Sequence, residues 1–463
     1  MRTGEVLERH PLPAEFLPGH AEDGNLVRYR GVGHDGIHRV VSGSVFVPVG
    51  PAPPGGWPVV SFAHGTTGLA DHLAPSRVGL TRYERDHVAR WLAEGFVVAA
   101  VDYEGLATPG PHPYFHGEAV ADDVIDIVRA ARELHDQVGR RWVVAGFSHG
   151  AHAALFTGLV ASRYAPELDF RGTIALAPPV HLPELVRYLT GGGDRPVSLL
   201  LPFLLAGVGD DGARPFLTET GRRLVDLATR ATLVDMYGAV AGLTNADAGM
   251  TDIHRHPGVT RVLRACRVPV TRMDRPVYLT AGSADEIVPA EIVAAFVADL
   301  RWAGADVRFD RHEGATHVEL LCTGLDRVVA WASRMVRTRT GFDWFDADHD
   351  GRLTCDDFTV YALRLAQACG CAPGAGPARA VRTAYAALWR AFAARTGTDA
   401  DDSVDRTEFT HRVETGAGFA REIAALADAV LCMAAGSDSV SAEEIAAAVR
   451  HPGRTDHWLF ARV

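Results

Sequence analysis

Short apolar runs alternate with amphipathic segments along the first three quarters of the chain. The apolar runs lie at residues 59–63, 96–101, 142–145, 173–177, 277–281 and 306–310, and a weaker alternating run at 41–47 is typical of an edge strand. Segments 83–94, 120–134 and 318–336 carry apolar residues at helical spacing. Continuous apolar runs separated by helices indicate strands buried on both faces. The pattern therefore predicts an α/β fold with a mostly parallel sheet.

The alternation is interrupted between about residues 182 and 274, where the pattern predicts helices and glycine-rich turns. From residue 342 onward the apolar periodicity is helical throughout. A chain of 463 residues is also too long for one ordinary hydrophobic core. We therefore predict two domains: an α/β domain at 1–337 with a helical insertion at about 182–274, and an all-α domain at 342–463.

One short motif carries the strongest chemical signal in the α/β domain. Gly146-Phe147-Ser148-His149-Gly150 follows an apolar run and precedes a helix rich in alanine. This strand–turn–helix context is that of a nucleophile elbow, in which small flanking residues allow a strained turn. We therefore predict that Ser148 is a nucleophile.

A serine nucleophile needs a base and an acid that orients the base. Asp285 follows the run at 277–281, and His317 follows the run at 306–310, so both lie after strands in the expected chain order. Glu286 and Asp274 are alternatives to Asp285, and His312 is the alternative to His317. The predicted triad is Ser148, His317 and Asp285.

An acyl-transfer site also needs hydrogen-bond donors for the oxyanion. The backbone N–H of His149, directly after the nucleophile, is one candidate. The second is the glycine-containing segment that follows the run at 59–63, where Gly65 allows the backbone to approach a substrate.

The second domain contains a twelve-residue segment, 346–357, with the pattern of an EF-hand loop. Positions one, three, five, seven and twelve are held by Asp346, Asp348, Asp350, Arg352 and Asp357. Gly351 stands at position six, where the loop turns sharply, and Leu353 is the apolar residue at position eight. The loop predicts a calcium site. Because Asp357 is one methylene shorter than the usual glutamate, we expect the site to hold Mg²⁺ as well.

Two weaker loops follow. The loop at 397–408 keeps acidic residues at Asp399, Asp401, Asp405 and Glu408, with Val404 at position eight. The loop at 433–444 has lost its acidic ligands and is predicted to be structural. These two loops start 36 residues apart (397 and 433), a spacing typical of paired hands.

Several segments in order resemble the lipase A-type secretory lipases, an α/β-hydrolase family. They are His64-Gly65-Thr66, Asp102-Tyr103-Glu104-Gly105, the segment 146–152, Ala165-Pro166-Glu167-Leu168 and the segment 285–289. The resemblance covers about residues 1–335 and implies a triad of Ser148, Asp285 and His317. It also implies that a protonated Asp102 helps to line the oxyanion hole and that the insertion forms a lid and acyl-binding region. The stretch 342–445 of the second domain resembles the calerythrin-like, sarcoplasmic-type calcium-binding proteins.

Charge and cysteine content limit the partners. A formal net charge of −11 argues against nucleic acid or an anionic membrane as the main partner. The sequence shows no apolar run long enough to span a membrane, no signal-peptide pattern after Met1, and six cysteines without a disulfide-like spacing. These features predict a cytoplasmic protein.

Together these features predict a serine carboxylic-ester hydrolase that acts on a small-molecule or lipid ester, needs no cofactor for the chemistry, and carries a calcium-binding domain. A peptidase or an acyltransferase could use the same triad. A calcium sensor or buffer with the α/β domain as a scaffold is the alternative from a different class.

Overall fold

The computed structural model describes residues 2–33, 36–53, 55–207, 213–336, 345–346, 351–368, 371–396, 403–405 and 408–409. The chain divides into two compact units, Met1–Arg337 and Thr338–Val463. This division falls between the two domains that the sequence predicts.

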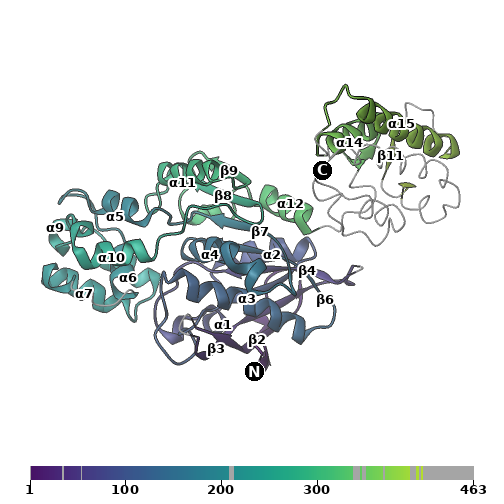
Figure 1. Cartoon of the computed structure of the whole chain (residues 1–463). Coiled ribbons are helices and arrows are strands. Elements are labelled where there is room, and N and C mark those ends of the chain that lie inside the picture. The colour runs from purple at the N-terminus through teal and green to yellow at the C-terminus, as the bar shows by residue number, and fades with distance from the viewer. Residues whose placement is uncertain are drawn as a thin grey trace. The chain divides into compact units, whose positions relative to one another are not determined.

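A nine-stranded sheet forms the centre of the first unit (Figure 1). Its strands are β1 (Val6–Pro11), β2 (Ala21–Val32), β3 (His38–Pro48), β4 (Trp57–Ala63), β5 (Val97–Val101), β6 (Val138–Phe147), β7 (Asp169–Leu176), β8 (Val277–Gly282) and β9 (Val307–His312), in the order β1-β2-β3-β5-β4-β6-β7-β8-β9. The neighbours from β5 to β9 pair in parallel, whereas β1, β2 and β3 are antiparallel. The prediction of an α/β fold with a mostly parallel sheet is confirmed.

The prediction of an edge strand at 41–47 is wrong. This segment belongs to β3, which lies inside the sheet between β2 and β5, and the edges are β1 and β9. Its polar residues are small: Ser42 and Ser44 are buried, and a Cβ on Gly43 would lie 2.4 Å from the carbonyl oxygen of Ala100. The alternation of apolar residues with small polar residues and glycine therefore reflects close packing and not exposure to water.

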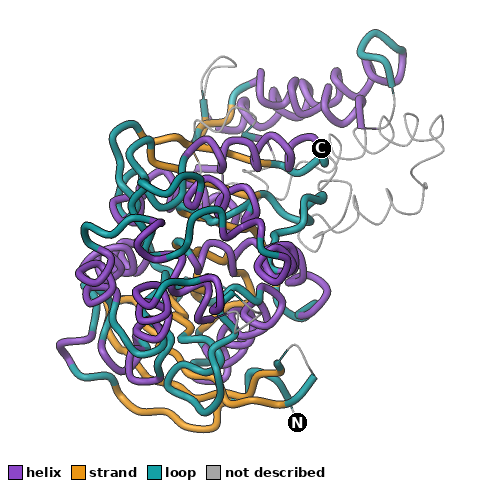
Figure 2. Tube along the Cα trace, turned by 90° about the vertical axis from the view of Figure 1, so that its left-hand side faces the viewer, coloured by secondary structure: helices purple, strands orange, loops and turns teal. Residues whose placement is uncertain are grey.

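Helices cover both faces of the sheet, as Figure 2 shows. The helices of the sheet region are α1 (Pro75–Val78), α2 (Arg82–Ala93), α3 (Gly117–Leu134), α4 (His149–Tyr164), α11 (Ala290–Trp302) and α12 (Leu325–Val336), with short 3₁₀ turns at Ala14–Phe16, Asp71–Leu73 and Val318–Leu321. Val59 packs in one core with α3 and α4, and the next residue, Val60, packs in another with α2 and α12. Burial on both faces explains why these strands are continuous apolar runs.

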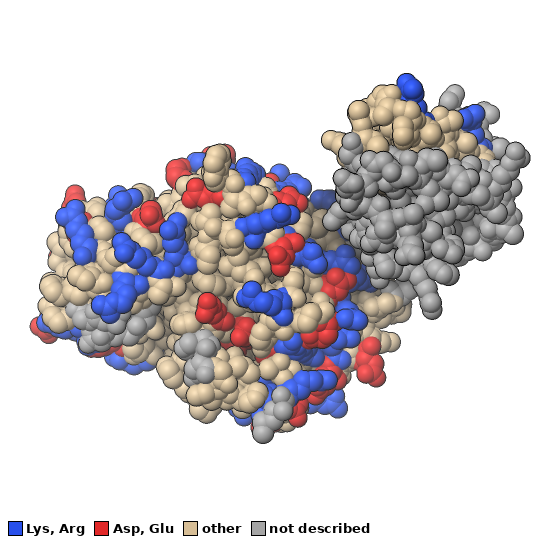
Figure 3. Space-filling model, in the orientation of Figure 1, with Lys and Arg blue, Asp and Glu red and all other residues tan. Residues whose placement is uncertain are grey.

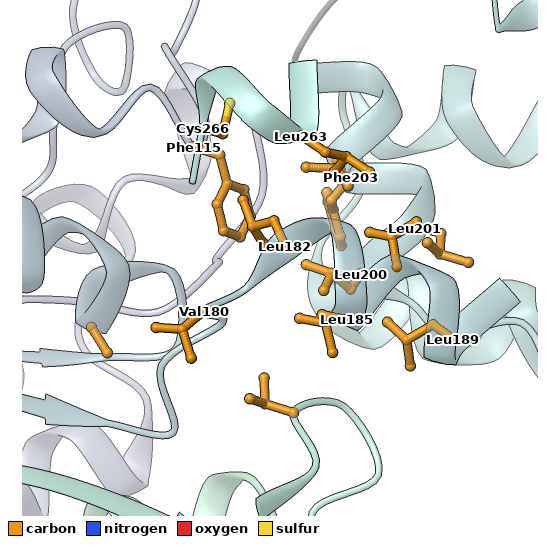
Figure 4. Packing of buried hydrophobic residues seen from close by; sticks show 14 of the residues in the cluster. Phe115, Val180, Leu182, Leu185, Leu189, Leu200, Leu201, Phe203, Leu263 and Cys266 are labelled. Atoms are coloured by element: carbon orange, nitrogen blue, oxygen red, sulfur yellow. The ribbon is translucent and has the colours of Figure 1, made fainter. Parts of the chain in front are cut away.

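Between β7 and β8 the described residues form a helical insertion. It contains α5 (Leu182–Thr190), α6 (Leu200–Gly207), α7 (Glu219–Ala228), α8 (Leu233–Val240), α9 (Asn245–Ala248) and α10 (Pro257–Ala265), with 3₁₀ turns at Arg214–Phe216 and Ile253–Arg255. Apolar side chains of α5, α6 and α10 pack against one another and against Phe115 of the sheet region (Figure 4). The insertion thus shares one core with the elements next to the nucleophile.

The second unit contains, in its described part, α14 (Cys355–Ala368), α15 (Gly376–Thr396) and two short strands, β10 (Arg352–Leu353) and β11 (Val404–Asp405). The strands pair antiparallel, with Leu353 opposite Val404. Phe358 of α14 is stacked on Phe345 at 4.2 Å between ring centroids, and it also contacts Trp389 of α15. Phe345, directly before the loop at 346–357, is thereby joined to both helices. The prediction of an all-α domain therefore omitted one short strand pair.

Acidic and basic side chains are interspersed over much of the visible face of the first unit (Figure 3). Among the described helices, none has the length and apolar character needed to cross a lipid bilayer.

Candidate active site

Ser148 lies at the turn between β6 and α4, in a backbone conformation that residues other than glycine rarely adopt. Its φ of 53° and ψ of −119° store strain of about 1–3 kcal/mol, which surrounding packing must offset. A Cβ on Gly146 would lie 2.0 Å from the carbonyl oxygen of Gly150, and a Cβ on Gly150 would lie 1.9 Å from that of Ala63. Only glycine fits at both positions, so the sequence forces the sharp turn that presents the serine hydroxyl.

His317 and Asp285 meet Ser148 from two other loops at the same end of the sheet. The Nε2 of His317 is 2.9 Å from the Oγ of Ser148, and its Nδ1 is 2.7 Å from an Oδ of Asp285. The other Asp285 oxygen accepts hydrogen bonds from the backbone N–H groups of Ile287 and Val288, at 2.9 and 2.8 Å. Asp285 is buried, and the turn after β8 fixes its orientation.

The alternative residues lie elsewhere. Asp274 and Glu286 are exposed. His312 ends β9, and a Cβ on Gly324 would lie 2.4 Å from the ring of His312. The three residues that the structure joins by hydrogen bonds are the predicted ones, in an arrangement that can transfer a proton from a hydroxyl to an imidazole held by a carboxylate.

His149 and Gly65 lie beside the nucleophile. His149 is the first residue of α4, so its backbone N–H has no partner within the helix. Gly65 approaches the nucleophile turn so closely that a Cβ on it would lie 2.8 Å from the ring of Phe147. Both backbone segments therefore lie next to the nucleophile turn.

Asp102, which the resemblance placed at the oxyanion hole, is hydrogen-bonded to two buried serines. Its carboxyl accepts hydrogen bonds from the hydroxyl of Ser42 at 2.7 Å, and from the backbone N–H and hydroxyl of Ser76 at 3.0 and 2.5 Å. Burial raises the pKa of Asp102 above its ordinary value, although these hydrogen bonds oppose the rise. The carboxyl thus joins β3 to α1, and the described hydrogen bonds of this residue give no support for a place in the oxyanion hole.

An aromatic shell around the ring of His149 was missed by the sequence analysis. Tyr114 is stacked on this ring at 4.5 Å between centroids, and the backbone N–H of Phe115 donates to its Nε2 at 3.3 Å. Burial, followed by the neighbouring histidines, holds the pKa of His149 well below its ordinary value. The ring is therefore a neutral packing element. No local pattern in the sequence marks Tyr114, because its partners are distant along the chain.

The predicted metal-binding residues lie in the second unit and are only partly described. Asp346 and Asp357 are buried, and Arg352 belongs to β10. Asp405 is in β11, and the backbone N–H of Asp405 donates a hydrogen bond to the carboxylate of Glu408 at 3.1 Å. The other predicted ligands (Asp348, Asp350, Asp399 and Asp401) and the third loop at 433–444 lie outside the described residues. Within the described part of the chain, no group of three or more metal-ligating side chains is gathered.

The sheet, the elbow and the hydrogen-bonded Ser148, His317 and Asp285 define the class of the α/β-hydrolase fold. Residues 72–340 match the secretory lipase family, and the chain belongs to this family. Its homologues support a carboxylic-ester hydrolase.

Relatives and solved structures agree with this assignment. The chain is 23% identical over 350 residues to lipase A of Moesziomyces aphidis, covering 70% of this chain and 74% of the relative. It is 24% identical over 312 residues to a Mycobacterium tuberculosis protein named as a probable inactive lipase, covering 62% and 68%. The cell-wall-degrading esterase LipA of Xanthomonas oryzae shares the fold with a TM-score of 0.60 at 18% identity, covering 72% of this chain and 99% of that one. Candida antarctica lipase A in its closed state gives 0.57 at 18% identity, with 73% and 84% covered.

The family assignment contradicts the predicted cytoplasmic location. The family consists of secretory lipases, whose members are secreted or extracellular. The prediction relied on two missing patterns, a signal peptide and a disulfide framework. The cysteines at 266, 322 and 355 are indeed free thiols, but free thiols do not identify a compartment, and the prediction is wrong.

Proposed function

We propose that Ser148 attacks the acyl carbon of a carboxylic ester and forms an acyl-enzyme. The observation that carries the proposal is the hydrogen-bond chain from Ser148 through His317 to Asp285. In this mechanism His317 takes the proton of the serine hydroxyl and gives it to the leaving alcohol, and water then attacks the acyl-enzyme. Asp285 keeps the Nδ1 of His317 protonated, so that Nε2 is free to act as the base.

The oxyanion would be held by backbone donors beside Ser148. The N–H of His149 lies at the start of a helix, where the helix dipole favours negative charge. The backbone around Gly65 supplies the second side of this hole. One such donor contributes a factor of about 10²–10³ in kcat.

The helical insertion is proposed to cover the site and to bind the acyl group. It packs against the loop after β4: a Cβ on Gly68 would lie 2.9 Å from the carbonyl oxygen of Ala231, just before α8. On α8 itself, Tyr237 has a pKa raised by burial and by the charge of Asp285. Val234 of the same helix is 80% exposed. An apolar helix beside the triad suits a substrate with an aliphatic acyl chain.

Hydrolysis of p-nitrophenyl esters of increasing acyl length tests this function, with Ser148→Ala as the matched control. We expect turnover by the wild type and none by Ser148→Ala above the rate without enzyme. A fluorophosphonate probe should label the wild type at Ser148. Labelling without ester turnover, combined with cleavage of amides or acyl transfer to an added alcohol, would favour a peptidase or an acyltransferase. An unlabelled, inactive wild type would favour the scaffold alternative.

A second candidate function is the binding of Ca²⁺ by the loop at 346–357. The observation that favours it is the register of β10 and β11, which sets Leu353 opposite Val404, the two residues at position eight of their loops. Gly351 has a φ of 84°, and the space around its Cβ position is open. Glycine is therefore favoured at position six by the left-handed backbone of the sharp turn and not by lack of space. Asp346 and Asp357, at the two ends of the loop, are both buried, and a bound cation would compensate their charge.

A further inference from the structure

Tyr114 touches three parts of the molecule that meet at the proposed active site. Its ring is stacked on His149, with 4.5 Å between centroids and 23° between planes. Its hydroxyl is hydrogen-bonded to the hydroxyl of Thr66 at 2.6 Å. On the insertion side, a Cβ on Gly207 would lie 2.5 Å from the Cβ of Tyr114 and 2.8 Å from its Cδ1.

These three contacts belong to separate segments of the chain. His149 follows the nucleophile, Thr66 follows Gly65 in the loop after β4, and Gly207 ends α6 of the insertion. Tyr114 is 2% exposed. A buried, rigid aromatic side chain with few rotatable bonds fixes the distance between the groups that it touches.

The backbone next to Tyr114 is strained, which is typical of functional regions. Phe115 has a φ of 60°, and this left-handed conformation goes together with the donation of its N–H to the Nε2 of His149. Tyr114 and Phe115 therefore hold the same imidazole, one by stacking and the other by a hydrogen bond. Ser148, the residue before His149, also has a positive φ, of 53°. Strained backbone therefore lies on both sides of this imidazole.

We propose that Tyr114 is a positioning residue for the oxyanion hole, which holds the segment His64–Thr66 against the nucleophile turn and makes the geometry of the hole depend on the placement of α6. The inference rests on the proposed function, because it assumes that the backbone at His149 and Gly65 binds the oxyanion. Its consequence is that a displacement of the insertion changes the rate of the chemical step as well as acyl binding.

The first test removes the hydroxyl contact and keeps the ring. Tyr114→Phe and Thr66→Val should each lower kcat by about tenfold and leave KM within about twofold, since the donors act in the transition state. Thr66→Ser keeps a hydroxyl and should retain the wild-type kcat. The double variant Tyr114→Phe/Thr66→Val should be no slower than either single variant, because both remove the same contact. Wild-type kcat in Tyr114→Phe, or multiplied losses in the double variant, would overturn the inference.

The second test acts from the insertion. Gly207→Ala should lower kcat, whereas Gly193→Ala, whose Cβ would meet Ala246 and Thr251 at ordinary distances of 3.4 and 3.5 Å, should not. Combined with Tyr114→Gly, which removes both the Cβ and the ring that the added methyl group would meet, Gly207→Ala should cause no further loss. If Gly207→Ala raises KM alone, α6 affects binding only and the coupling is refuted. Failure of the proposed function is recognised separately, by a Ser148→Ala variant that still turns over esters.

Discussion

At the scale of single residues, the candidate site consists of side chains whose directions are set by their own local turns. Ser148 is presented by a strained elbow between two glycines, and Asp285 by two backbone N–H groups of the following turn. His317 has no such local cap, and it is held by its two partners in the triad. Its position therefore depends most on the remainder of the site.

The assignment of the base is tested by comparing His317 with His312, the last residue of β9. His317→Ala should lower kcat by a factor of about 10⁴ or more, because it removes the imidazole that is hydrogen-bonded to the Oγ of Ser148. His312→Ala should change kcat little, since its ring packs at Gly324. Both variants should be compared with the wild type by circular dichroism. An inactive His312→Ala beside an active His317→Ala would show that the base is wrongly assigned.

Asp102 allows a second test at this scale. Because its carboxyl accepts three hydrogen bonds from Ser42 and Ser76, Asp102→Ala should lower the free energy of unfolding by about 1–3 kcal/mol, which urea denaturation measures. Asp102→Asn keeps an acceptor for the N–H of Ser76 and should lose less. A direct oxyanion donor would behave differently: Asp102→Ala would lose about 2–4 kcal/mol of transition-state stabilisation at unchanged stability.

The nucleophile and its partners could be predicted from the sequence because each follows an apolar run with a local turn pattern. The partners of Asp102 and the role of Tyr114 could not. Ser42 and Ser76 are 60 and 26 residues away from Asp102, and Thr66 is 48 residues away from Tyr114. Such contacts are fixed by the packing of β3, α1 and the loop after β4, on which a single sequence carries no local signal.

At the scale of elements, helix α3 carries a group of acidic residues that face the antiparallel part of the sheet. Asp123 is fully buried and accepts a hydrogen bond from the backbone N–H of Glu104, and Asp126 is paired with Arg129. Next to them, burial and then the charge of Asp126 raise the pKa of Asp122 to about 7. The helix therefore holds carboxyls that stay protonated far above their ordinary range.

This raised pKa predicts how stability changes with pH. A carboxyl with a raised pKa in the folded state stabilises the fold below its unfolded pKa, and this contribution is lost as pH rises toward about 7. Asp122→Asn keeps the side chain neutral at every pH. It should leave the free energy of unfolding unchanged at pH 4 and raise it by roughly 1–2 kcal/mol at pH 8, as measured by urea denaturation. An equal effect at both pH values would mean that Asp122 is already ionised at pH 4.

The insertion gives a prediction about substrates. Its apolar helices share a core with Phe115 and, through α8, approach Asp285. Each methylene of an acyl chain buried there contributes about 0.8 kcal/mol. The specificity constant should therefore rise with acyl length from acetate upward in a series of p-nitrophenyl esters. A sharp preference for acetate, without activity on medium chains, would show that the insertion does not bind the acyl group.

At the scale of the whole molecule, the chain combines a hydrolase unit with a second unit of different architecture. The existence of the second unit could be predicted, because the period of the apolar pattern changes near residue 342. The pairing of the first loop with the second was not predicted. Sequence spacing favoured pairing of the second and third loops, whereas β10 and β11 join the first loop to the second. This register follows from the packing of α14 against α15 and from Phe358 between Phe345 and Trp389, which loop spacing alone does not reveal.

The proposed metal site of the second unit gives the last prediction, tested by titration calorimetry of the full chain with Ca²⁺ and with Mg²⁺. Asp346→Ala should remove one binding event, because it deletes the proposed ligand at position one of the first loop. The matched control is Asp356→Ala, which changes an exposed residue at position eleven that is no ligand, and this variant should bind as the wild type does.

The carboxyl of Asp357 already accepts hydrogen bonds from the N–H and hydroxyl of Thr354, at 2.8 and 2.7 Å, so this short side chain is partly engaged at the start of its own helix.

Asp357→Glu should therefore tighten the binding of Ca²⁺ relative to Mg²⁺, because the longer side chain can offer both oxygens, and Ca²⁺ takes six to eight oxygen ligands whereas Mg²⁺ takes six. Since Ser148, Asp285 and His317 all belong to the first unit, none of these variants should abolish ester hydrolysis. Equal uptake of both ions by the wild type and by Asp346→Ala would exclude the first loop as a metal site. A fall in kcat/KM on addition of a chelator to the wild type, absent in Asp346→Ala, would instead show that metal at this loop controls the hydrolase.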